Sequence, residues 1–212
     1  MSKVFVNIGL SLDGYMAPEG MSLDHWDDPE YLGWGMKWGS MMAWILKQQY
    51  FREHLHVGTG GEVGPVNDLL RSTSERIGAN IMGKRMFEQG EISWPEEAPF
   101  RTPVYVLTHD ERDPWERPGG TTFHFITEGP EHALKLARQS AGDKDIRISG
   151  GANVIQQYLN LDVVEELEIA LAPVLFFGGR RLFENVRPAI SRFAIAHVLD
   201  GPDATHLKYV RQ

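Results

Sequence analysis

Two adjacent glycines between a predicted strand and a predicted helix are the feature of this chain best suited to bind a ligand. They lie in the stretch Ile148-Ser149-Gly150-Gly151-Ala152-Asn153-Val154, with the strand predicted at residues 145–148 and the helix at 153–159. Glycine has no Cβ, so two adjacent glycines allow a sharp turn and let a ligand lie against the backbone. Because the first turn of a helix presents unpaired N–H groups, this order favours a phosphate or diphosphate ligand. A tight turn that binds nothing would carry the same residues.

Two further strand ends carry suitable side chains. Gly83 is followed by Lys84 and Arg85 in the first turn of a predicted helix, where cations oppose the helix dipole. A bound phosphomonoester would resolve that conflict, although a solvated surface pair is the plainer alternative. The strand before Thr108 and His109 ends in a hydroxyl and an imidazole that could contact a ribose or a phosphate. A surface turn explains this last pair equally well.

The segments around these residues alternate between strand and helix. This alternation predicts an α/β fold with a mostly parallel central sheet flanked by helices. The last two strands, joined by Asp200-Gly201-Pro202-Asp203, predict an antiparallel hairpin at one edge. The predicted strands are residues 4–10, 80–82, 103–107, 122–126, 145–148, 166–170, 173–177, 193–198 and 206–210, and the predicted helices are 65–77, 84–89, 130–141 and 153–159.

Residues 18–64 break the alternation and read as an insertion into a single domain that spans residues 1–212. Glycine-rich joints surround one predicted helix at about residues 41–55. Four of the six tryptophans fall here, namely Trp26, Trp34, Trp38 and Trp44. We expect the insertion to shape a substrate pocket, with a lid or a dimer surface as the alternatives.

Composition narrows the class of protein. The 212 residues carry a formal net charge of −8, so no basic footprint predicts binding to nucleic acid or to an anionic membrane. The chain has no cysteine, which excludes disulfides, thiolate catalysis and cysteine-based zinc sites. No metal site is predicted, because the spacing of His25, His54 and His56 suits no helical ligand pair. No apolar run approaches a membrane span, and the short apolar start does not resemble a signal peptide, so we expect a cytoplasmic protein.

The motifs, in their order, resemble the dihydrofolate reductase superfamily. The similarity is strongest to the branch that includes the reductase domain of bacterial riboflavin-biosynthesis deaminase-reductases. It is carried by Ser-Leu-Asp-Gly at 11–14, Met-Gly-Lys-Arg-Met-Phe at 82–87, Val-Leu-Thr at 106–108, Gly-Gly-Ala-Asn-Val at 150–154, and the runs at 162–167 and 172–183. The resemblance covers residues 4–14 and 65–210.

The resemblance implies a dihydrofolate reductase-like fold, NADPH as cofactor and a homodimer. Residues 150–154 would hold the diphosphate, Lys84 and Arg85 the 2′-phosphate and diphosphate, and Thr108 and His109 the adenosine ribose phosphate. The nicotinamide end would reach toward Asp13 and Gly14. The implied cofactor-binding residues are Gly14, Gly83, Lys84, Arg85, Thr108, His109, Ser149, Gly150, Gly151, Ala152, Asn153 and Val154.

The substrate side departs from the family pattern at two positions. The acid that dihydrofolate reductases place on the helix before the Met-Gly strand falls here on Asn67, with Asp68 beside it at another angle around the helix. The glutamate that riboflavin-pathway reductases carry before the paired glycines is replaced by Ser149. Asp13 and Asp68 are the candidate catalytic residues, with a turn residue before Gly14 and a first-turn helix residue favoured by the dipole as the respective alternatives. Water could deliver a proton without either.

These residues favour an NADPH-dependent reductase of a small, heterocyclic substrate. One alternative is a pyrimidine reductase of riboflavin biosynthesis, against which Ser149 argues. The other is a nucleotide-binding or sensor protein that has lost turnover.

Overall fold

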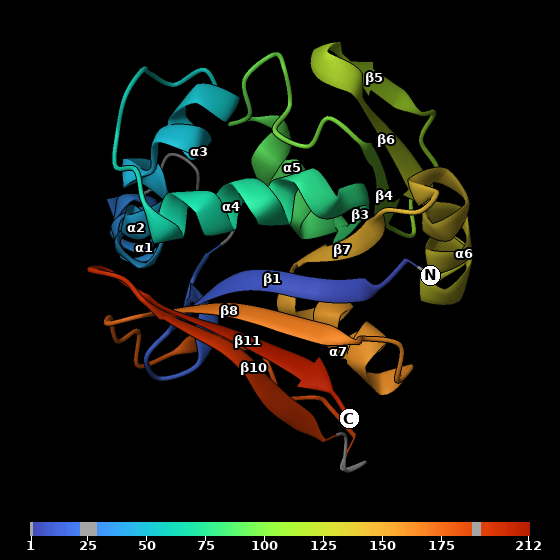
Figure 1. Cartoon of the computed structure of the whole chain (residues 1–212). Coiled ribbons are helices and arrows are strands. Elements are labelled where there is room, and N and C mark those ends of the chain that lie inside the picture. Colours follow the sequence, from blue (N-terminus) through green and yellow to red (C-terminus); the bar gives the residue numbers. More distant parts are fainter. Residues whose placement is uncertain (1, 22–28, 188–191) are drawn as a thin grey trace.

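A computed structural model describes residues 2–21, 29–187 and 192–212. Its main sheet has the strand order β10-β11-β8-β1-β7-β3-β4-β6-β5, and a second, two-stranded sheet pairs β2 with β9 (Figure 1). The strands are β1 (Val4–Ser11), β2 (Tyr15–Pro18), β3 (Ile77–Gly83), β4 (Pro103–Leu107), β5 (Trp115–Arg117), β6 (Thr121–Ile126), β7 (Asp145–Gly150), β8 (Glu166–Ala172), β9 (Gly179–Arg181), β10 (Phe193–Asp200) and β11 (Thr205–Arg211).

The six middle strands of the main sheet, from β8 to β6, run parallel to one another. At one edge β11 pairs antiparallel with β8 and β10 pairs antiparallel with β11, which confirms the predicted C-terminal hairpin. The short strand β5 adds an antiparallel pair at the other edge. The predicted α/β class, mostly parallel with an antiparallel edge hairpin, is therefore confirmed.

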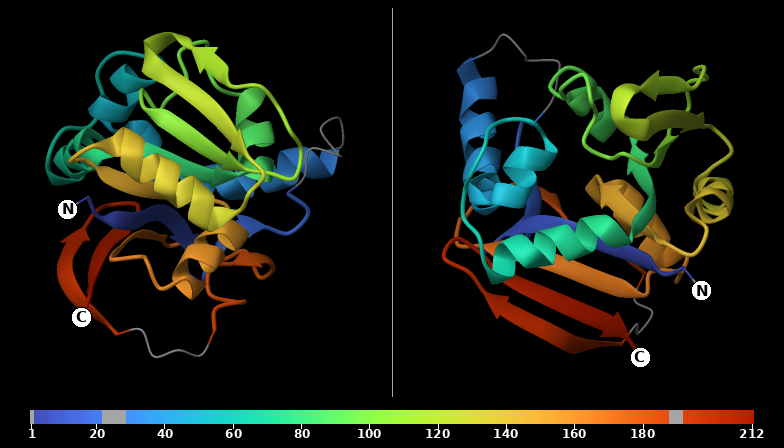
Figure 2. Two further views of the ribbon diagram at one scale, coloured as in Figure 1. Left: turned by 90° about the vertical axis from the view of Figure 1, so that its right-hand side faces the viewer. Right: turned by 45° about the horizontal axis from the view of Figure 1, so that its top comes forward.

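Helices cover both faces of the sheet (Figures 1 and 2). Helices α6 (Pro130–Ala141) and α7 (Ala152–Asn160) pack on one face against the even-numbered side chains of β1, among them Val4 and Val6. Helices α4 (Pro65–Arg76) and α5 (Lys84–Glu91) lie on the other face. Proline at the first position of α4 and α6 suits a helix start, because its missing N–H would be unpaired there anyway.

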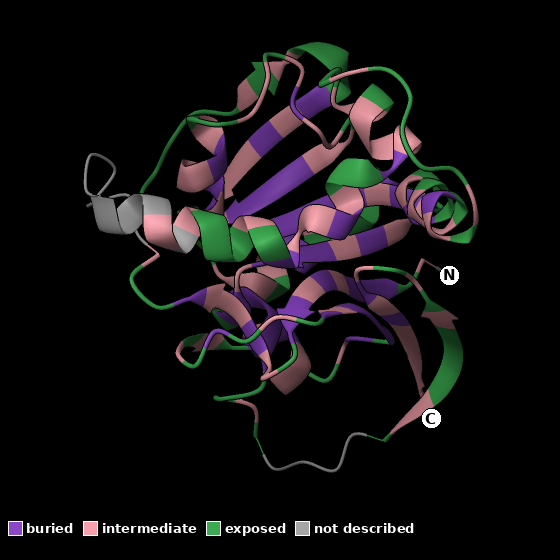
Figure 3. Cartoon of the chain, turned by 90° about the vertical axis from the view of Figure 1, so that its left-hand side faces the viewer, coloured by how far each residue is buried: buried purple, intermediate pink, exposed green. Residues whose placement is uncertain are grey.

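The core follows from this layering. Strands covered on both faces have no solvent side, which is why β1 and β8 carry almost continuous buried positions, the charged Glu166 and Glu168 of β8 among them. Figure 3 shows the buried residues concentrated in the middle strands. None of the described helices is long and apolar enough to cross a membrane.

The insertion differs from its prediction. In place of one helix at 41–55 the chain forms α1 (Pro29–Met41), α2 (Ala43–Lys47) and α3 (Gln49–His54). The break falls at Gln48, whose backbone is extended and whose buried side chain donates to the Trp44 carbonyl and the Glu62 carboxylate. Residues on either side of Gln48 also bond the backbone of Glu62, so a distant strand-like contact interrupts the helix. Trp26 and the side chain of Trp34 lie outside the described part of the chain.

The apolar segment at 173–177 forms no strand. It is held instead against the turn that follows β1, where the amide of Leu12 donates to the Val174 carbonyl over 2.8 Å. Phe177 adopts a left-handed backbone with φ of 61° and leaves its side chain 83% exposed. Because its amides bond the turn at Asp13, this segment cannot pair with the sheet.

Candidate functional site

The carboxyl ends of the parallel strands bring the predicted residues to one edge of the sheet. Strand β1 ends beside Asp13, β7 ends at Gly150, β3 ends at Gly83 and β4 ends beside Thr108. These strands are neighbours in the order β1-β7-β3-β4. The candidate groups therefore follow one another across the edge in the order Asp13 turn, paired glycines, Lys84-Arg85 pair and Thr108-His109. A dinucleotide bound in an extended form along this edge would meet them in that order.

The glycines at this edge let two helix starts approach each other. A Cβ placed on Gly83 would lie only 2.8 Å from Cγ2 of Val154, in the first turn of α7. Gly150 has a φ of +131°, a conformation open to glycine, and the peptide bond to Gly151 is cis. Neither α5 nor α7 receives a side-chain cap at its first residues. The free N–H groups of Ala152, Asn153 and their counterparts in α5 thus face the edge where an anion could bind.

The cations at the start of α5 are not equivalent. The Lys84 ammonium is hydrogen-bonded to the Asp110 carboxylate, which raises the pKa of Lys84, and it lies 3.6 Å from Glu88. Arg85 is exposed and forms no ion pair within the described ranges. Burial and the charge of Arg85 lower the pKa of Arg180, which places Arg180 of β9 near Arg85. Like charges that act on each other in this way would be relieved by an anion close to both.

Thr108 and His109 form part of a turn at the end of β4. The Thr108 hydroxyl accepts a hydrogen bond from the Asp110 amide over 3.0 Å, and His109 is exposed. Asp110 links this turn to Lys84. The structure thus joins the cation pair and the Thr-His turn through one carboxylate.

Asp13 is committed to the loop that faces it. Its carboxylate accepts hydrogen bonds from the Ser11 hydroxyl (2.6 Å) and from the amides of Phe177 (2.8 Å) and Phe176 (3.2 Å). Burial acts to raise the pKa of Asp13, but these hydrogen bonds lower it below its ordinary value. The side chain therefore stays ionised at neutral pH and cannot donate a proton. Gly14 follows with φ of +85° and closes the turn.

Asn67 and Asp68 point in different directions around helix α4, as their adjacent positions in the sequence predict. Asn67 is 3% exposed, and its side-chain oxygen accepts from the Tyr50 amide over 2.7 Å. Asp68 is exposed on the first turn of α4. The structure thus turns the amide inward, toward the insertion, and the carboxylate outward.

Ser149 lies on the same sheet face as α4. It is 5% exposed, and its hydroxyl donates to the side-chain oxygen of Asn80 over 2.9 Å. Asn80 in turn donates to the Thr102 hydroxyl. This neutral chain of hydrogen bonds occupies the position beside the paired glycines.

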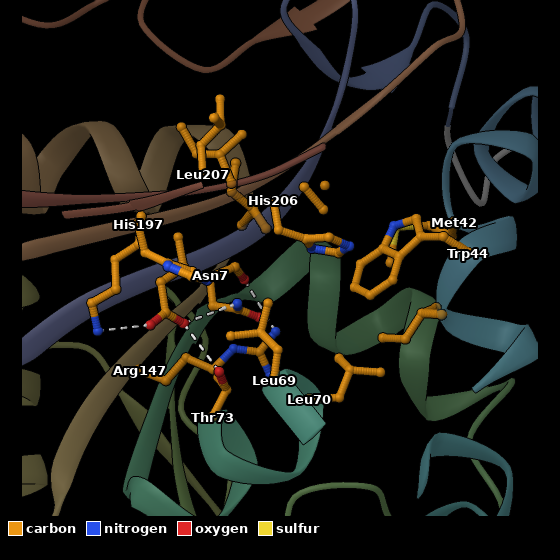
Figure 4. Close-up of a pocket in the computed structure, with 17 residues that line it drawn as sticks. Asn7, Met42, Trp44, Leu69, Leu70, Thr73, Arg147, His197, His206 and Leu207 are labelled. Carbon is orange, nitrogen blue, oxygen red and sulfur yellow. Dashed lines mark hydrogen bonds and ion pairs between the residues drawn. The ribbon is translucent and has the colours of Figure 1, made fainter. Parts of the chain in front are cut away.

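A cavity of about 70 Å³ lies on this face, between α4 and the insertion on one side and strands β1, β8 and β11 on the other (Figure 4). Two of its residues, Gly9 and Ala170, stand two positions before the ends of β1 and β8, so the cavity extends toward the candidate edge. Trp44 of the insertion forms part of its wall, whereas Trp38 is 39% exposed. The remaining lining residues are Asn7, Ile8, Met42, Ile45, Leu69, Leu70, Thr73, Arg147, Glu168, Ile169, His197, His206, Leu207 and Lys208.

Comparison with known proteins shows which family the chain belongs to. A family model described as the RibD C-terminal domain matches residues 2–200. This chain belongs to the RibD C-terminal domain family. A structure similar to this family member over nearly its whole length is a putative riboflavin biosynthesis protein from Shewanella sp. PV-4, with 21% identity and a TM-score of 0.64, covering 100% of this chain and 99% of that one.

Two other solved structures share the fold. Dihydrofolate reductase from Enterococcus faecalis, complexed with NADP(H) and RAB-propyl, is 16% identical with a TM-score of 0.54, covering 99% of this chain and 96% of that one. A diaminohydroxyphosphoribosylaminopyrimidine deaminase/5-amino-6-(5-phosphoribosylamino)uracil reductase from Thermotoga maritima is 11% identical with a TM-score of 0.57. The RibD-like chain is covered entirely in that match but spans only 57% of the Thermotoga protein. These likenesses confirm the dihydrofolate reductase-like fold.

A curated relative matches over a shorter stretch. The protein YyaP of Bacillus subtilis (strain 168) is 31% identical over 67 residues, which is 32% of this RibD family member. The match spans about a third of YyaP, 35% of its length.

Several residues of the site were not predicted from the sequence. Arg180 lies in the run at residues 172–183 that carries the resemblance, but the resemblance implied no role for it. Arg147 and His206 stand alone in strands and have no motif around them. Alternation along the strands β7 and β11 could have placed them on a face, but not beside a cavity.

Proposed function

We propose that this chain is an NADPH-dependent oxidoreductase that reduces a small substrate. The observation that carries the proposal is the order of groups along the sheet edge. The turn at Asp13 and Gly14, the paired glycines, the cations of α5 and the Thr-His turn follow one another on adjacent strands. In an extended dinucleotide with an additional phosphomonoester, the diphosphate and then the phosphomonoester follow in the same order as the paired glycines and the cations of α5.

The residues present suit that cofactor. At Gly83 a side chain would collide with Val154, so the backbone there is bare and close to the start of α7. Gly150, Gly151 and the first turn of α7 would hold the diphosphate. Arg85, with Arg180 nearby, would hold the phosphomonoester. When bound, NADPH would supply a hydride from its nicotinamide ring.

The substrate would enter the cavity beside α4 from the same edge. Gly9 and Ala170 line the cavity where it approaches the ends of β1 and β8, and the Met42 side chain packs directly over Gly9, where a Cβ would lie 2.9 Å from its Sδ. Asp13 is ionised and Ser149 is bonded to Asn80, so neither serves as a ready proton source. We therefore assign proton delivery to water, while the chain orients the substrate and excludes bulk solvent.

Fluorescence titration with NADPH and with NADH tests the cofactor. Because Lys84 is paired with Asp110 whereas Arg85 is free within the described ranges, Arg85→Ala should weaken NADPH binding more than Lys84→Ala does. We expect roughly tenfold weaker NADPH binding for Arg85→Ala, about 1.4 kcal/mol, with NADH binding little changed. The matched control is Lys135→Ala/Arg138→Ala on α6, which removes two exposed cations far from the edge.

Binding of neither nucleotide would overturn the proposal. Binding without NADPH consumption across a panel of carbonyl and imine substrates would favour the nucleotide-binding or sensor alternative. Turnover of the phosphoribosyl-aminopyrimidine would instead establish the riboflavin-pathway alternative.

A further inference from the structure

Two residues that line the cavity, Glu168 and Lys208, belong to an ion-pair network whose charges balance within itself. The carboxylate of Glu168 accepts hydrogen bonds from Asn7, Thr73, Arg76 and Lys208. The same network includes Glu166 at 2.6 Å from Lys3. It joins three cations to three carboxylates, namely Lys3, Arg76 and Lys208 with Asp145, Glu166 and Glu168.

Arg147 is a fourth cation without a carboxylate of its own. It lies on β7 and lines the cavity next to Asn7 and Thr73 (Figure 4). Its single hydrogen bond runs from Nη2 to the Asn7 carbonyl over 3.2 Å, and its Nε is buried with no partner in the described structure. Across the described ranges it makes no ion pair, and the nearby Glu168 carboxylate, whose charge acts on Arg147, is already paired with Arg76 and Lys208. Burial lowers the pKa of Arg147 to about 10, so the guanidinium is still charged at neutral pH.

Arg147 is half-buried, and its charge is only partly compensated, because the carboxylate nearest in effect, Glu168, is shared with two other cations. The guanidinium offers Nε and Nη donors in a fork that matches the two oxygens of a carboxylate. The position of Arg147 at a cavity wall therefore fits an anion that arrives as a ligand.

Two further donors lack partners at the other end of the cavity. Trp44 and His206 are 8% and 7% exposed, and the indole Nε1 and imidazole Nε2 find no hydrogen bond among the described residues. Their rings meet edge to face with centroids 4.6 Å apart. Burial lowers the pKa of His206, so it is neutral at pH 7. Figure 4 shows Arg147 toward one end of the group of lining residues and Trp44 toward the other, with Leu69 and Leu70 of α4 also lining the cavity.

We propose that the cavity binds a small organic monocarboxylate, with the carboxylate on Arg147, an apolar body against α4, and an acceptor group toward Trp44 and His206. The volume of about 70 Å³ suits a ligand of roughly five non-hydrogen atoms, since one water needs about 10–15 Å³ of such space. If the proposed reductase activity holds, on which this last step rests, the ligand is the substrate and its acceptor group is the carbonyl or imine to be reduced.

The test is calorimetric titration of the cofactor-free protein with sodium propionate, with propionamide as the uncharged ligand of the same shape. We expect propionate to bind at least tenfold more tightly than propionamide. Arg147→Met should abolish that preference while NADPH binding is retained. Arg112→Met is the matched control, because Arg112 pairs with Glu91 at a distance from the cavity and should leave propionate binding unchanged.

Thermal unfolding separates a binding role from a structural one. If the charge of Arg147 is not fully compensated within the protein, the Arg147→Met variant should unfold at no lower temperature than the unsubstituted chain. Propionate should raise the unfolding temperature of the unsubstituted chain but not that of the variant. Equal binding of propionate and propionamide, or unchanged propionate binding in Arg147→Met, would overturn the proposal. Should Arg147→Met fail to fold, the propionate–propionamide comparison on the unsubstituted chain still decides. NADPH binding is measured independently, so its failure would count against the reductase and not against this site.

Discussion

At the scale of single residues, this protein uses most of its buried charge for structure and leaves little for acid–base chemistry. Glu166 is 2% exposed, and its carboxylate accepts from Arg76, Lys3 and Lys208. Asp13 is used in the same way to hold the loop at 176–177. Among the described residues that line the cavity, Arg147 is a cation with no ion pair, and this argues for an anionic ligand more than for a catalytic acid.

Glu166 should make the protein sensitive to acid. Burial acts to raise its pKa, but hydrogen bonds from Lys208, Lys3 and Arg76 lower it to about 2 from the ordinary 4.5. A lowered folded-state pKa stabilises the protein above pH 4.5, and that contribution is lost as the pH falls toward about 2. It amounts to about 3 kcal/mol at neutral pH, because a tenfold change in proton affinity corresponds to about 1.4 kcal/mol.

Urea unfolding at pH 7 and pH 3 checks this. Glu166→Gln should be about 3 kcal/mol less stable than the unsubstituted chain at pH 7, and the gap should shrink at pH 3. Glu111→Gln, at an exposed position, is the control. A gap that is the same at both pH values would contradict the assigned role.

At the scale of elements, the insertion is a set of short helices held in place by backbone contacts rather than by helix length. Helices α2 and α3 have five and six residues, too short to be stable alone. The backbone of Glu62 bonds both sides of the break at Gln48 and fixes the angle between them. Because Trp44 and Ile45 of α2 line the cavity, this junction sets the position of a cavity wall.

Gly61 should be the sensitive glycine of that junction. A Cβ at Gly61, where φ is +136°, would lie 2.6 Å from the Lys47 carbonyl oxygen and 2.9 Å from the Gln49 nitrogen. Gly60→Ala is the matched control, because Gly60 also has a positive φ, +69°, but has nothing within 4 Å. We expect Gly61→Ala to be about 1–3 kcal/mol less stable than Gly60→Ala by urea unfolding. Equal stabilities of Gly61→Ala and Gly60→Ala would show that the backbone at this junction can shift to accept a Cβ without loss of stability.

At the scale of the whole molecule, the sheet ends in a strand that has one described neighbour. Strand β10 pairs with β11 and presents its other edge outward. Its side chains are exposed on both faces, with Ile195 at 66% and Val198 at 52%. An exposed apolar edge is a template for pairing with another chain. We therefore propose that the predicted homodimer, if it forms, pairs two β10 strands side by side at this edge.

Light scattering over a concentration series checks the dimer. Ile195→Lys should shift the protein toward the monomer, because a charge would be buried at the pairing edge. Val63→Lys is the control, since Val63 is 71% exposed on the insertion and away from β10. If the unsubstituted chain is a monomer at every concentration, or if Ile195→Lys and Val63→Lys dissociate equally, the β10 edge is not a dimer interface.

The alternation of strands and helices, the hairpin at the C-terminus and the groups at each strand end could all be predicted from the amino-acid sequence alone. These features are local: a run of apolar residues, a proline at a helix start or a pair of glycines acts through its immediate neighbours. Since carboxyl ends of parallel strands share an edge, the candidate cofactor residues could also be grouped without knowledge of the fold's details.

What each side chain still has to offer a ligand depends on tertiary contacts. Asp13 is bound by an amide 164 residues away, and Ser149 by an asparagine 69 residues away. The predicted helix at 41–55 is broken by Glu62, and Arg147 becomes a surplus charge only when distant acids and bases pair with one another. Hydrogen bonding and charge balance depend on which segments meet in space, and residue spacing along the chain does not carry that information.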